Sequence, residues 1–253
     1  ICLYSRGEHA QAAMRQEFGD DPRLRWFIGD IRDLSRLTRA MSGVDVVIAA
    51  AALKRIETGA YNPSEVIMTN TFGAMNVIEA ASAAGVAKVV ALSTDKAYHP
   101  VSPYGQTKAL AESLFLNANV ERPNGPKFAV TRYGNITGSS GSFYPKWKAL
   151  IAAGATVVPV TDPECTRFFM TQEEACALVM DTLNTMQGGE LVIPHWLPAY
   201  RLGDVAQALG VGMEVTGLPA WEKLHESMDA DCCSATARRM SVAENREAIE
   251  RSF

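Results

Sequence analysis

The chain has 253 residues, of which 47% are hydrophobic, and its formal net charge is −4. This length is enough for one large or two modest domains, and the slightly acidic balance argues against a general nucleic-acid or membrane-surface binder. No apolar stretch is long and charge-free enough to span a bilayer, and the five cysteines show no zinc spacing. We therefore expect a reduced cytoplasmic protein with no metal site and no nucleic-acid or membrane partner.

Strand and helix patterns alternate along the first half of the chain. The expected strands are Ile1–Tyr4, Leu24–Ile28, Val44–Ala49, Val86–Leu92 and Phe128–Arg132. The expected helices are Glu8–Phe18, Ser35–Met41, Pro63–Ala84 and Tyr104–Asn117. This alternation is typical of a parallel sheet with helices on both faces. The sequence therefore predicts an α/β fold, a doubly wound parallel sheet of the Rossmann type.

The regular alternation fades after Asn135. Residues 138–142 (Gly-Ser-Ser-Gly-Ser) are expected to form a loop, and the polar tail from Asp229 a helix or a loose end. Further elements are expected at Pro145–Ala153, Val157–Val160, Gln172–Met186, Leu191–Ile193 and Leu202–Leu209. We therefore predict a Rossmann-type domain over residues 1–135. Residues 136–253 would mainly form a smaller mixed α/β substrate lobe, with the chain returning to the first domain.

A cluster of polar side chains follows the apolar strand that ends at Leu92. The run Ser93-Thr94-Asp95-Lys96 lies just past that strand, where open α/β sheets bind ligands. Tyr104 and Lys108 have the spacing that places two side chains on one face of a helix. An ammonium beside a phenol stabilises the phenolate, so such a tyrosine can exchange protons near neutral pH. The sequence thus predicts a cleft equipped for acid/base chemistry.

Each of these features also has a simpler interpretation. The Tyr-x-x-x-Lys spacing occurs by chance in many helices, and Asp95 and Lys96 could form a surface ion pair that contributes little. Arg6 follows a strand where a guanidinium can clamp a 2′-phosphate, but it could equally be a solvated loop residue. The position of the tyrosine after a buried strand that ends in Ser-Thr-Asp-Lys favours the catalytic interpretation.

The order and spacing of several short motifs resemble a known family. They are Tyr4-Ser5-Arg6, Gly29-Asp30-Ile31-Arg32-Asp33-Leu34, Ala50-Ala51-Ala52-Leu53-Lys54, Tyr61-Asn62-Pro63, Thr69-Asn70, Leu92-Ser93-Thr94-Asp95-Lys96-Ala97, Tyr104-Gly105-Gln106-Thr107-Lys108, Arg132-Tyr133-Gly134-Asn135, Thr166-Arg167-Phe168 and Glu222-Lys223-Leu224-His225-Glu226. From Ile1 to about Met228 the chain resembles the extended short-chain dehydrogenase/reductases. Within them it is similar to the soluble UDP-N-acetylglucosamine 4,6-dehydratases that invert carbon 5, in the CapD-like polysaccharide-biosynthesis group.

The resemblance implies an NADP-dependent lyase of surface polysaccharide or glycan precursor synthesis. Tyr104 would take the proton of the sugar 4-hydroxyl while NADP⁺ accepts the hydride from carbon 4. Lys96 would then remove the carbon-5 proton, Asp95 would protonate the leaving 6-hydroxyl, and the hydride would return to carbon 6. Thr94 would bind a substrate oxygen, and Lys108 would hold the nicotinamide ribose and lower the pKa of Tyr104.

The resemblance also implies the residues that bind the two ligands. Those expected to hold NADP are Ser5, Arg6, Asp30, Ile31, Ala50, Ala51, Ala52, Tyr104 and Lys108. Those expected to face UDP-N-acetylglucosamine or a related nucleotide sugar are Lys54, Asn135 and Arg167. Relatives of this kind assemble, so we expect a homo-oligomer.

Departures from the family pattern leave two alternatives open. The family's first strand and glycine-rich phosphate loop are absent, which would weaken pyrophosphate binding. An arginine expected to touch the substrate diphosphate is replaced within the run Pro219-Ala220-Trp221-Glu222-Lys223. The alternatives are a nucleotide-sugar epimerase, which uses the same tyrosine chemistry without loss of water, and a non-catalytic truncated remnant.

Overall fold

The computed structural model describes residues 1–138 and 143–251, so positions 139–142 of the predicted loop lie outside the described residues. The strands are β1 (Cys2–Ser5), β2 (Arg25–Ile28), β3 (Val46–Ala49), β4 (Lys88–Leu92), β5 (Lys127–Thr131), β6 (Asn135–Ile136), β7 (Val157–Val160), β8 (Thr166–Met170), β9 (Leu191–Val192), β10 (Ala199–Arg201) and β11 (Gly212–Val215). The α-helices are α1 (Glu8–Phe18), α2 (Leu34–Ala40), α3 (Ile56–Tyr61), α4 (Pro63–Val66), α5 (Gly73–Ala84), α6 (Pro103–Glu121), α7 (Phe143–Ala152), α8 (Gln172–Thr185), α9 (Leu202–Leu209) and α10 (Val242–Arg251). A π-helical segment, η1 (Ile67–Phe72), and a 3₁₀ turn, η2 (Asp95–Ala97), complete the order.

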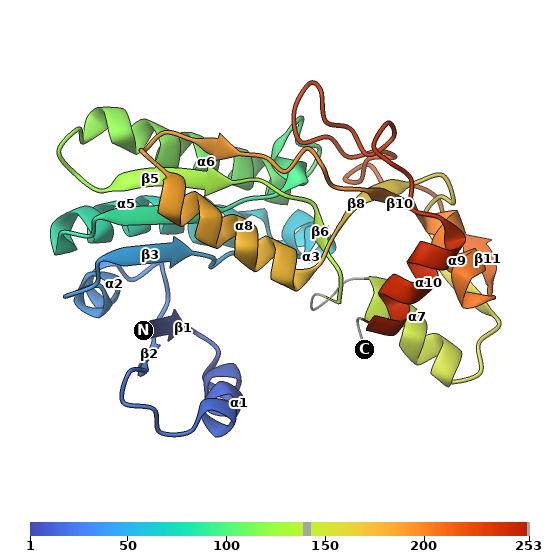
Figure 1. Ribbon diagram of the computed structural model, residues 1–253, viewed down its shortest axis with the longest axis horizontal. Helices are drawn as coiled ribbons and strands as arrows, with labels where there is room; N and C mark the ends of the chain where they lie inside the picture. Colours follow the sequence, from blue (N-terminus) through green and yellow to red (C-terminus); the bar gives the residue numbers. More distant parts are fainter. Residues whose placement is uncertain (139–142, 252–253) are drawn as a thin grey trace.

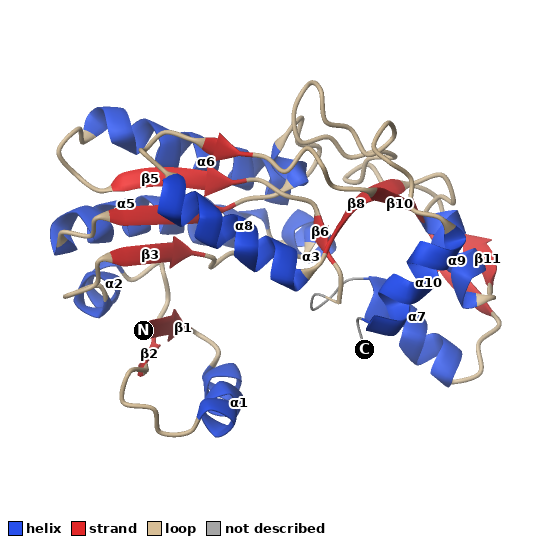
Figure 2. Cartoon of the chain, viewed as in Figure 1, coloured by secondary structure: helices blue, strands red, loops and turns tan. Residues whose placement is uncertain are grey.

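The larger sheet is parallel and has helices on both faces (Figures 1 and 2). Its strand order is β3-β4-β5-β9, so the chain returns to this sheet after a long excursion. Alternate residues of β4 point to opposite faces: Val89 packs with residues of α5 and α6, whereas Val90 packs with Val179 and Met186 beside α8. This two-sided burial explains the continuous apolar run in the sequence and confirms the predicted α/β fold.

The first two strands form a separate small sheet. β1 and β2 pair in parallel, and within the described residues no strand ladder joins them to β3. A cavity of about 200 Å³ lies between them and the larger sheet, lined on one side by Cys2 and Tyr4 and on the other by residues 46–51. The outward side chains of β3 are accordingly exposed, Val46 at 37% and Ile48 at 47%.

The second half of the chain supplies two further sheets (Figure 1). In one, β6 runs parallel to β8 and β10 antiparallel to it; in the other, β7 and β11 run parallel. α7 and α9 contribute Trp147 and Val205 to the core that covers β7. β6 begins at Asn135, close to the predicted boundary between the Rossmann-type domain and the substrate lobe, and that division stays a prediction.

Several elements differ from their expected form. The predicted helix over residues 63–84 is three segments, α4, η1 and α5, and within η1 the side chain of Asn70 hydrogen-bonds to the backbone of Leu53 and to Thr107. The strands β6, β8, β10 and β11 were not predicted. The tail after Asp229 is packed into the protein and ends in α10, with Ser234 fully buried. No helix in the described part of the chain is long and apolar enough to cross a membrane.

Candidate active site

The turn after β4 carries the Thr-Asp-Lys run in a fixed conformation. Thr94 caps η2 by accepting the Lys96 backbone N–H at 3.3 Å. The Asp95 backbone N–H donates to the Tyr133 carbonyl at 3.0 Å, which ties the turn to the segment after β5. The side chain of Asp95 is completely buried. The predicted catalytic residues of this turn therefore stand on the carboxyl end of the central sheet.

Helix α6 begins directly against this turn. Ser102 is its N-cap, accepting the Gly105 N–H at 3.2 Å, and Pro103 occupies its first position. A Cβ on Gly105 would lie 2.3 Å from the Lys96 carbonyl oxygen, so only glycine permits this approach. The close contact brings Tyr104, which directly precedes Gly105 on the helix, into the same buried site as Lys96.

Lys96 lies among oxygen acceptors from three parts of the chain. Its Nζ donates to Asp95 Oδ1 and to Asn135 Oδ1, both at 3.0 Å, and lies 3.6 Å from Glu226 Oε1. Burial lowers the pKa of Lys96, but the charges of Asp95 and Glu226 outweigh it and raise the pKa above its ordinary value. Lys96 is thus held as an ammonium before any substrate binds.

Tyr104 is buried, and burial raises the pKa of its hydroxyl. The ammonium of Lys96 and a hydrogen bond with Thr94 oppose that increase, whereas Asp95 adds to it. Lys108 lies one helical turn further, where its Nζ donates to the Leu92 carbonyl at 2.6 Å. Burial lowers the pKa of Lys108 to about 8, against an opposing influence of Glu112. An amine with this pKa can exchange a proton near neutral pH.

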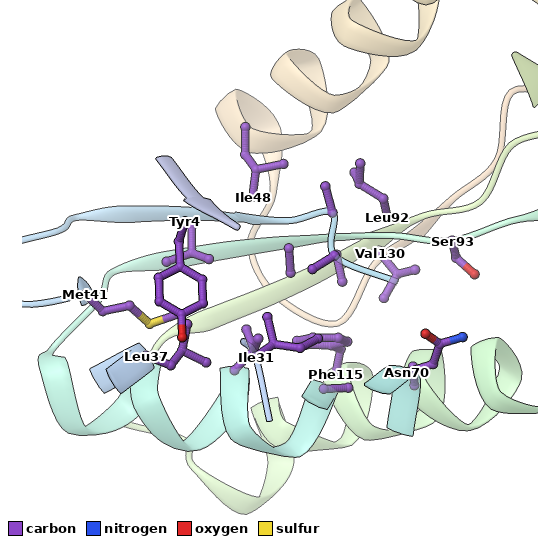
Figure 3. A pocket seen from close by; sticks show the side chains of 18 of the residues that line it. Tyr4, Ile31, Leu37, Met41, Ile48, Asn70, Leu92, Ser93, Phe115 and Val130 are labelled. Carbon is purple, nitrogen blue, oxygen red and sulfur yellow. The ribbon is translucent and has the colours of Figure 1, made fainter. Parts of the chain in front are cut away.

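The cavity between the two parallel sheets reaches this site at Ser93 and Lys108 (Figure 3). Small side chains line its end beside β3, including the predicted cofactor residues Ala50 and Ala51. Ile31, also predicted, lines it and lies so close to α5 that a Cβ on Gly73 would be 2.4 Å from its Cδ1. Ser93 Oγ is buried without a hydrogen-bond partner. The cavity therefore offers an unused polar atom to a ligand.

The remaining predicted cofactor residues lie at the ends of β1 and β2. Ser5 Oγ accepts from Gln11, and Arg6 Nη1 lies 3.5 Å from Asp30 Oδ2. A hydrogen bond from Arg32 lowers the pKa of Asp30, with burial opposing and the charge of Arg6 assisting. This carboxylate lies between two guanidinium groups, and Arg32 also pairs with Glu65 at 2.9 Å, so two cations and two carboxylates meet at this edge.

Of the predicted substrate residues, Asn135 contacts the catalytic cluster directly, whereas Arg167 is paired with Glu222. Asn135 is part of the site, since it accepts from Lys96 and donates to the Tyr200 hydroxyl at 3.4 Å. Arg167 is buried, its Nη2 donates to Glu222 Oε1 at 2.7 Å and its Nη1 donates to the Thr166 and Leu224 carbonyls, so its role towards the nucleotide sugar stays a prediction.

Of the predicted cofactor residues, Ile31, Ala50, Ala51 and Lys108 line the cavity, whereas Ser5, Arg6, Asp30, Ala52 and Tyr104 do not. Lys54 is exposed and, like Ala52, is not among the cavity-lining residues.

Four groups in or beside the site were not assigned by sequence reasoning. They are Asn70, Tyr200, the buried pair Glu112–Arg132, and Glu226. Glu226 ends the run Glu222-Lys223-Leu224-His225-Glu226. This run is irregular rather than helical, and His225 bridges to β8 and hydrogen-bonds to Thr166 at 2.8 Å. Within the described residues, no cluster of three or more His, Cys, Asp or Glu side chains could hold a metal ion.

The chain is similar to known proteins over most of its length. A family model described as "Polysaccharide biosynthesis protein" matches residues 1–244, which extends past Met228. Over 231 residues the chain is 46% identical to the UDP-N-acetylglucosamine 4,6-dehydratase (inverting) of Campylobacter jejuni subsp. jejuni serotype O:2, covering 90% of this chain and 69% of that protein. It is also 40% identical to a UDP-glucose 4-epimerase of Rickettsia canadensis, over 83% of this chain and 61% of that one.

A solved structure confirms the fold. The X-ray structure of Pen from Bacillus thuringiensis superposes with a TM-score of 0.94 at 30% identity, covering 100% of this chain and 89% of that one. Since the family model spans nearly the whole chain, and the dehydratase relative shares almost half its residues over nine-tenths of it, the chain belongs to the polysaccharide biosynthesis protein family of the extended short-chain dehydrogenases/reductases.

Proposed function

We propose that this protein is a nucleotide-sugar 4,6-dehydratase that acts on UDP-N-acetylglucosamine. The observation that supports this most directly is the grouping of Lys96, Asp95 and Tyr104 in one buried site, with an amine 3.0 Å from a carboxylate. Oxidation of an alcohol needs only the phenol, whereas elimination of water needs a base and an acid in addition. The 46% identical relative, named as such a dehydratase, adds support.

In this proposal each side chain moves or holds one proton. Tyr104, as the phenolate, accepts the proton of the sugar 4-hydroxyl. The Lys96 ammonium passes a proton to Asp95, whose Oδ1 lies 3.0 Å from Nζ, and the neutral amine then accepts the proton from carbon 5. Asp95 donates the proton it received to the departing 6-hydroxyl, which leaves as water, and Thr94 donates a hydrogen bond to a substrate oxygen. The Asp95 Oδ2 atom is buried without a hydrogen-bond partner, as suits a group that will meet a ligand.

NADP is the proposed cofactor. The cavity meets the catalytic site at Ser93 and Lys108, where the nicotinamide end would lie, and the rest of its lining is mostly apolar. Ser5, Arg6, Asp30, Ile31 and residues 50–52 would hold the adenosine end. Arg6 favours a 2′-phosphate over a bare ribose, since its guanidinium is half-exposed and has a loose contact of 3.5 Å with Asp30, whereas Arg32 is paired with Asp30 and Glu65. When bound, NADP supplies the acceptor and donor of the hydride.

The other ligand contacts and the cellular setting are part of the same proposal. Asn135 and Arg167 would face the nucleotide sugar, with Lys54 reaching it from an exposed loop. We propose a cytoplasmic homo-oligomer that supplies precursors for surface polysaccharides or glycans.

Proton NMR of the protein with UDP-N-acetylglucosamine and NADP⁺ tests the function. A new methyl doublet is expected from the 6-deoxy-4-keto product. Lys96→Met should lower its rate of appearance by about 10²–10⁴-fold, the usual contribution of an acid/base group. Lys146→Met is the matched control, because Lys146 is exposed on α7. Absence of the methyl signal, or equal rates for the two variants, would contradict the proposal.

An epimerase is the second candidate, because the chain is 40% identical to a UDP-glucose 4-epimerase. Epimerisation inverts a carbon without losing water, so the mass of the product distinguishes the two reactions. A product lighter by one water supports the dehydratase, and an unchanged mass with a new anomeric signal supports the epimerase.

A further inference from the structure

Glu226 is a buried carboxylate that approaches Lys96 from the far half of the chain. Its side chain is 2% exposed, with Oε1 lying 3.6 Å from Lys96 Nζ and Oε2 lying 2.8 Å from Lys223 Nζ. The backbone of Glu226 is fixed independently, since its N–H donates to Ser234 Oγ at 2.9 Å and its carbonyl accepts the Ser234 N–H at 2.7 Å. The carboxylate is therefore held in place by a scaffold that does not involve the turn after β4.

Burial of a carboxylate is costly unless cations compensate for it. Burial raises the pKa of Glu226, but the charges of Lys96, Arg167 and Lys223 outweigh it and hold the pKa below its ordinary value. Of the three cations, Lys96 has the largest effect on the pKa of Glu226, and the charge of Glu226 in turn helps to raise the pKa of Lys96. The two groups thus stabilise each other's charged forms.

We propose that Glu226 is a positioning residue for Lys96, which sets the charge that the Lys96 amine carries before substrate binds. The catalytic use of that amine rests on the function proposed above. Asp95 and Asn135 accept hydrogen bonds from two of the three ammonium N–H groups. Glu226 Oε1 lies 3.6 Å from Nζ, beyond hydrogen-bond distance, so Glu226 acts on the amine through its charge.

The charged and titratable groups around Lys96 come from several elements. They are Asp95 on its own turn, Tyr104 on α6, Arg167 on β8, Tyr200 on β10, and Glu226 with Lys223 on the irregular segment. Among them, Asp95 and Glu226 are the two carboxylates that raise the pKa of Lys96. Glu226→Gln keeps the shape of the side chain and removes one of these two charges, so it tests the pairing directly.

A double-mutant cycle on unfolding measures the coupling without substrate or cofactor. Glu226→Gln should lower the urea midpoint in the wild-type background, because Lys96 loses a counter-charge. In the Lys96→Met background, Glu226→Gln should lower the urea midpoint much less, or should raise it, because the carboxylate that it removes has already lost Lys96 as its partner. Glu79→Gln is the control, since Glu79 pairs with Arg122 and neither acts on Lys96, so its effect on the urea midpoint should be equal in both backgrounds. If Glu226→Gln lowered the urea midpoint equally in the wild-type and Lys96→Met backgrounds, the proposal would be overturned.

The reactivity of the Lys96 amine gives a second readout in the folded protein. Only the unprotonated amine reacts with acetic anhydride, so its labelling rate at fixed pH follows the neutral fraction. Glu226→Gln should increase acetylation of Lys96 several-fold relative to the exposed Lys146 in the same sample, measured by peptide mass spectrometry. Lys223→Met should decrease it, because it frees Glu226 to interact with Lys96 alone. An unchanged rate in both variants would refute the pairing.

The two readouts also separate this inference from the proposed function. Failure to form the methyl product would overturn the proposed dehydratase activity, but it would not change the expected results of the unfolding and acetylation experiments. Additive unfolding and unchanged labelling would overturn the positioning role and leave the dehydratase standing. For Glu226→Asp, which keeps the charge but shortens its reach, labelling of Lys96 should be intermediate between wild type and Glu226→Gln. Labelling equal to that of Glu226→Gln would mean that charge is not what acts on Lys96.

Discussion

The buried pair Arg132–Glu112 joins three parts of the fold and allows a quantitative prediction. Arg132, at the end of β5, donates from Nε to Glu112 Oε1 of α6 at 2.9 Å and from Nη2 to Oε2, while Nη1 donates to the Met228 carbonyl. The two residues are 7% and 5% exposed. Arg132→Met would therefore remove the ion-pair partner of a carboxylate inside the protein, with the charge of Lys108 remaining nearby, and would leave the Met228 carbonyl without this donor.

Removing one partner of a buried ion pair typically destabilises a protein by about 3–5 kcal/mol. In a protein of this size each kcal/mol corresponds to about 2–4 °C in Tm, so Arg132→Met should lower Tm by about 6–20 °C. The double variant Glu112→Gln with Arg132→Met should recover part of that loss, because the carboxylate that lost its ion-pair partner is then removed as well. Thermal and urea unfolding of the three proteins measure these changes.

The surface pair Arg122–Glu79 provides the control. Its side chains are 32% and 51% exposed, and such pairs contribute about 0–1 kcal/mol. Arg122→Met should therefore shift Tm by only a few degrees. If Arg132→Met cost no more than Arg122→Met, or if the double variant were less stable than Arg132→Met alone, burial would not be the reason for the importance of this pair.

Two further predictions concern α6. The pKa of Lys108 is lowered to about 8 in the folded protein, so between pH 8 and about 10.5 the unfolded chain binds the extra proton and stability should rise with pH. Urea midpoints measured across this window should show that rise in wild type relative to Lys108→Met, and parallel curves would contradict the assigned pKa. Gly105→Ala places a Cβ 2.3 Å from the Lys96 carbonyl, so it should cost about 1–3 kcal/mol, whereas the exposed neighbour Gln106→Ala should stay within about 0.5 kcal/mol. Equal unfolding midpoints for the last two variants would show that the turn can move aside.

The parts of the fold that could be predicted from sequence are those controlled by local pattern. The apolar run of β4 predicted a strand buried on both faces, and Val89 and Val90 are both fully buried. The spacing of Tyr104 and Lys108 predicted one face of a helix, and both side chains point to the end of β4. In each case the period of the element alone determines the outcome.

The parts that could not be predicted depend on partners distant in the chain. β8 contains Thr166 and Arg167, two polar residues that interrupt the apolar pattern of a buried strand. Arg167 can be buried there because it pairs with Glu222, which is distant in the sequence. The η1 segment within the predicted long helix accompanies contacts of Asn70 with Leu53 and Thr107. Glu226 lies close to Lys96 only in the folded protein. The two residues are far apart in the sequence, so no local pattern predicts their contact.

The separation of the β1–β2 sheet from β3 has a consequence for how this protein opens. Residues 1–28 form a unit whose backbone ladder is internal, and Tyr4 is the member of this unit that packs against the main core. Such a unit has its own local unfolding free energy, lower than that of β4 and β5, whose strands are paired on both sides. Amide hydrogen exchange would then divide the molecule into a rapidly opening first unit and a slowly exchanging centre. The end of the cavity formed by Cys2 and Tyr4 would be present only while the first unit is closed.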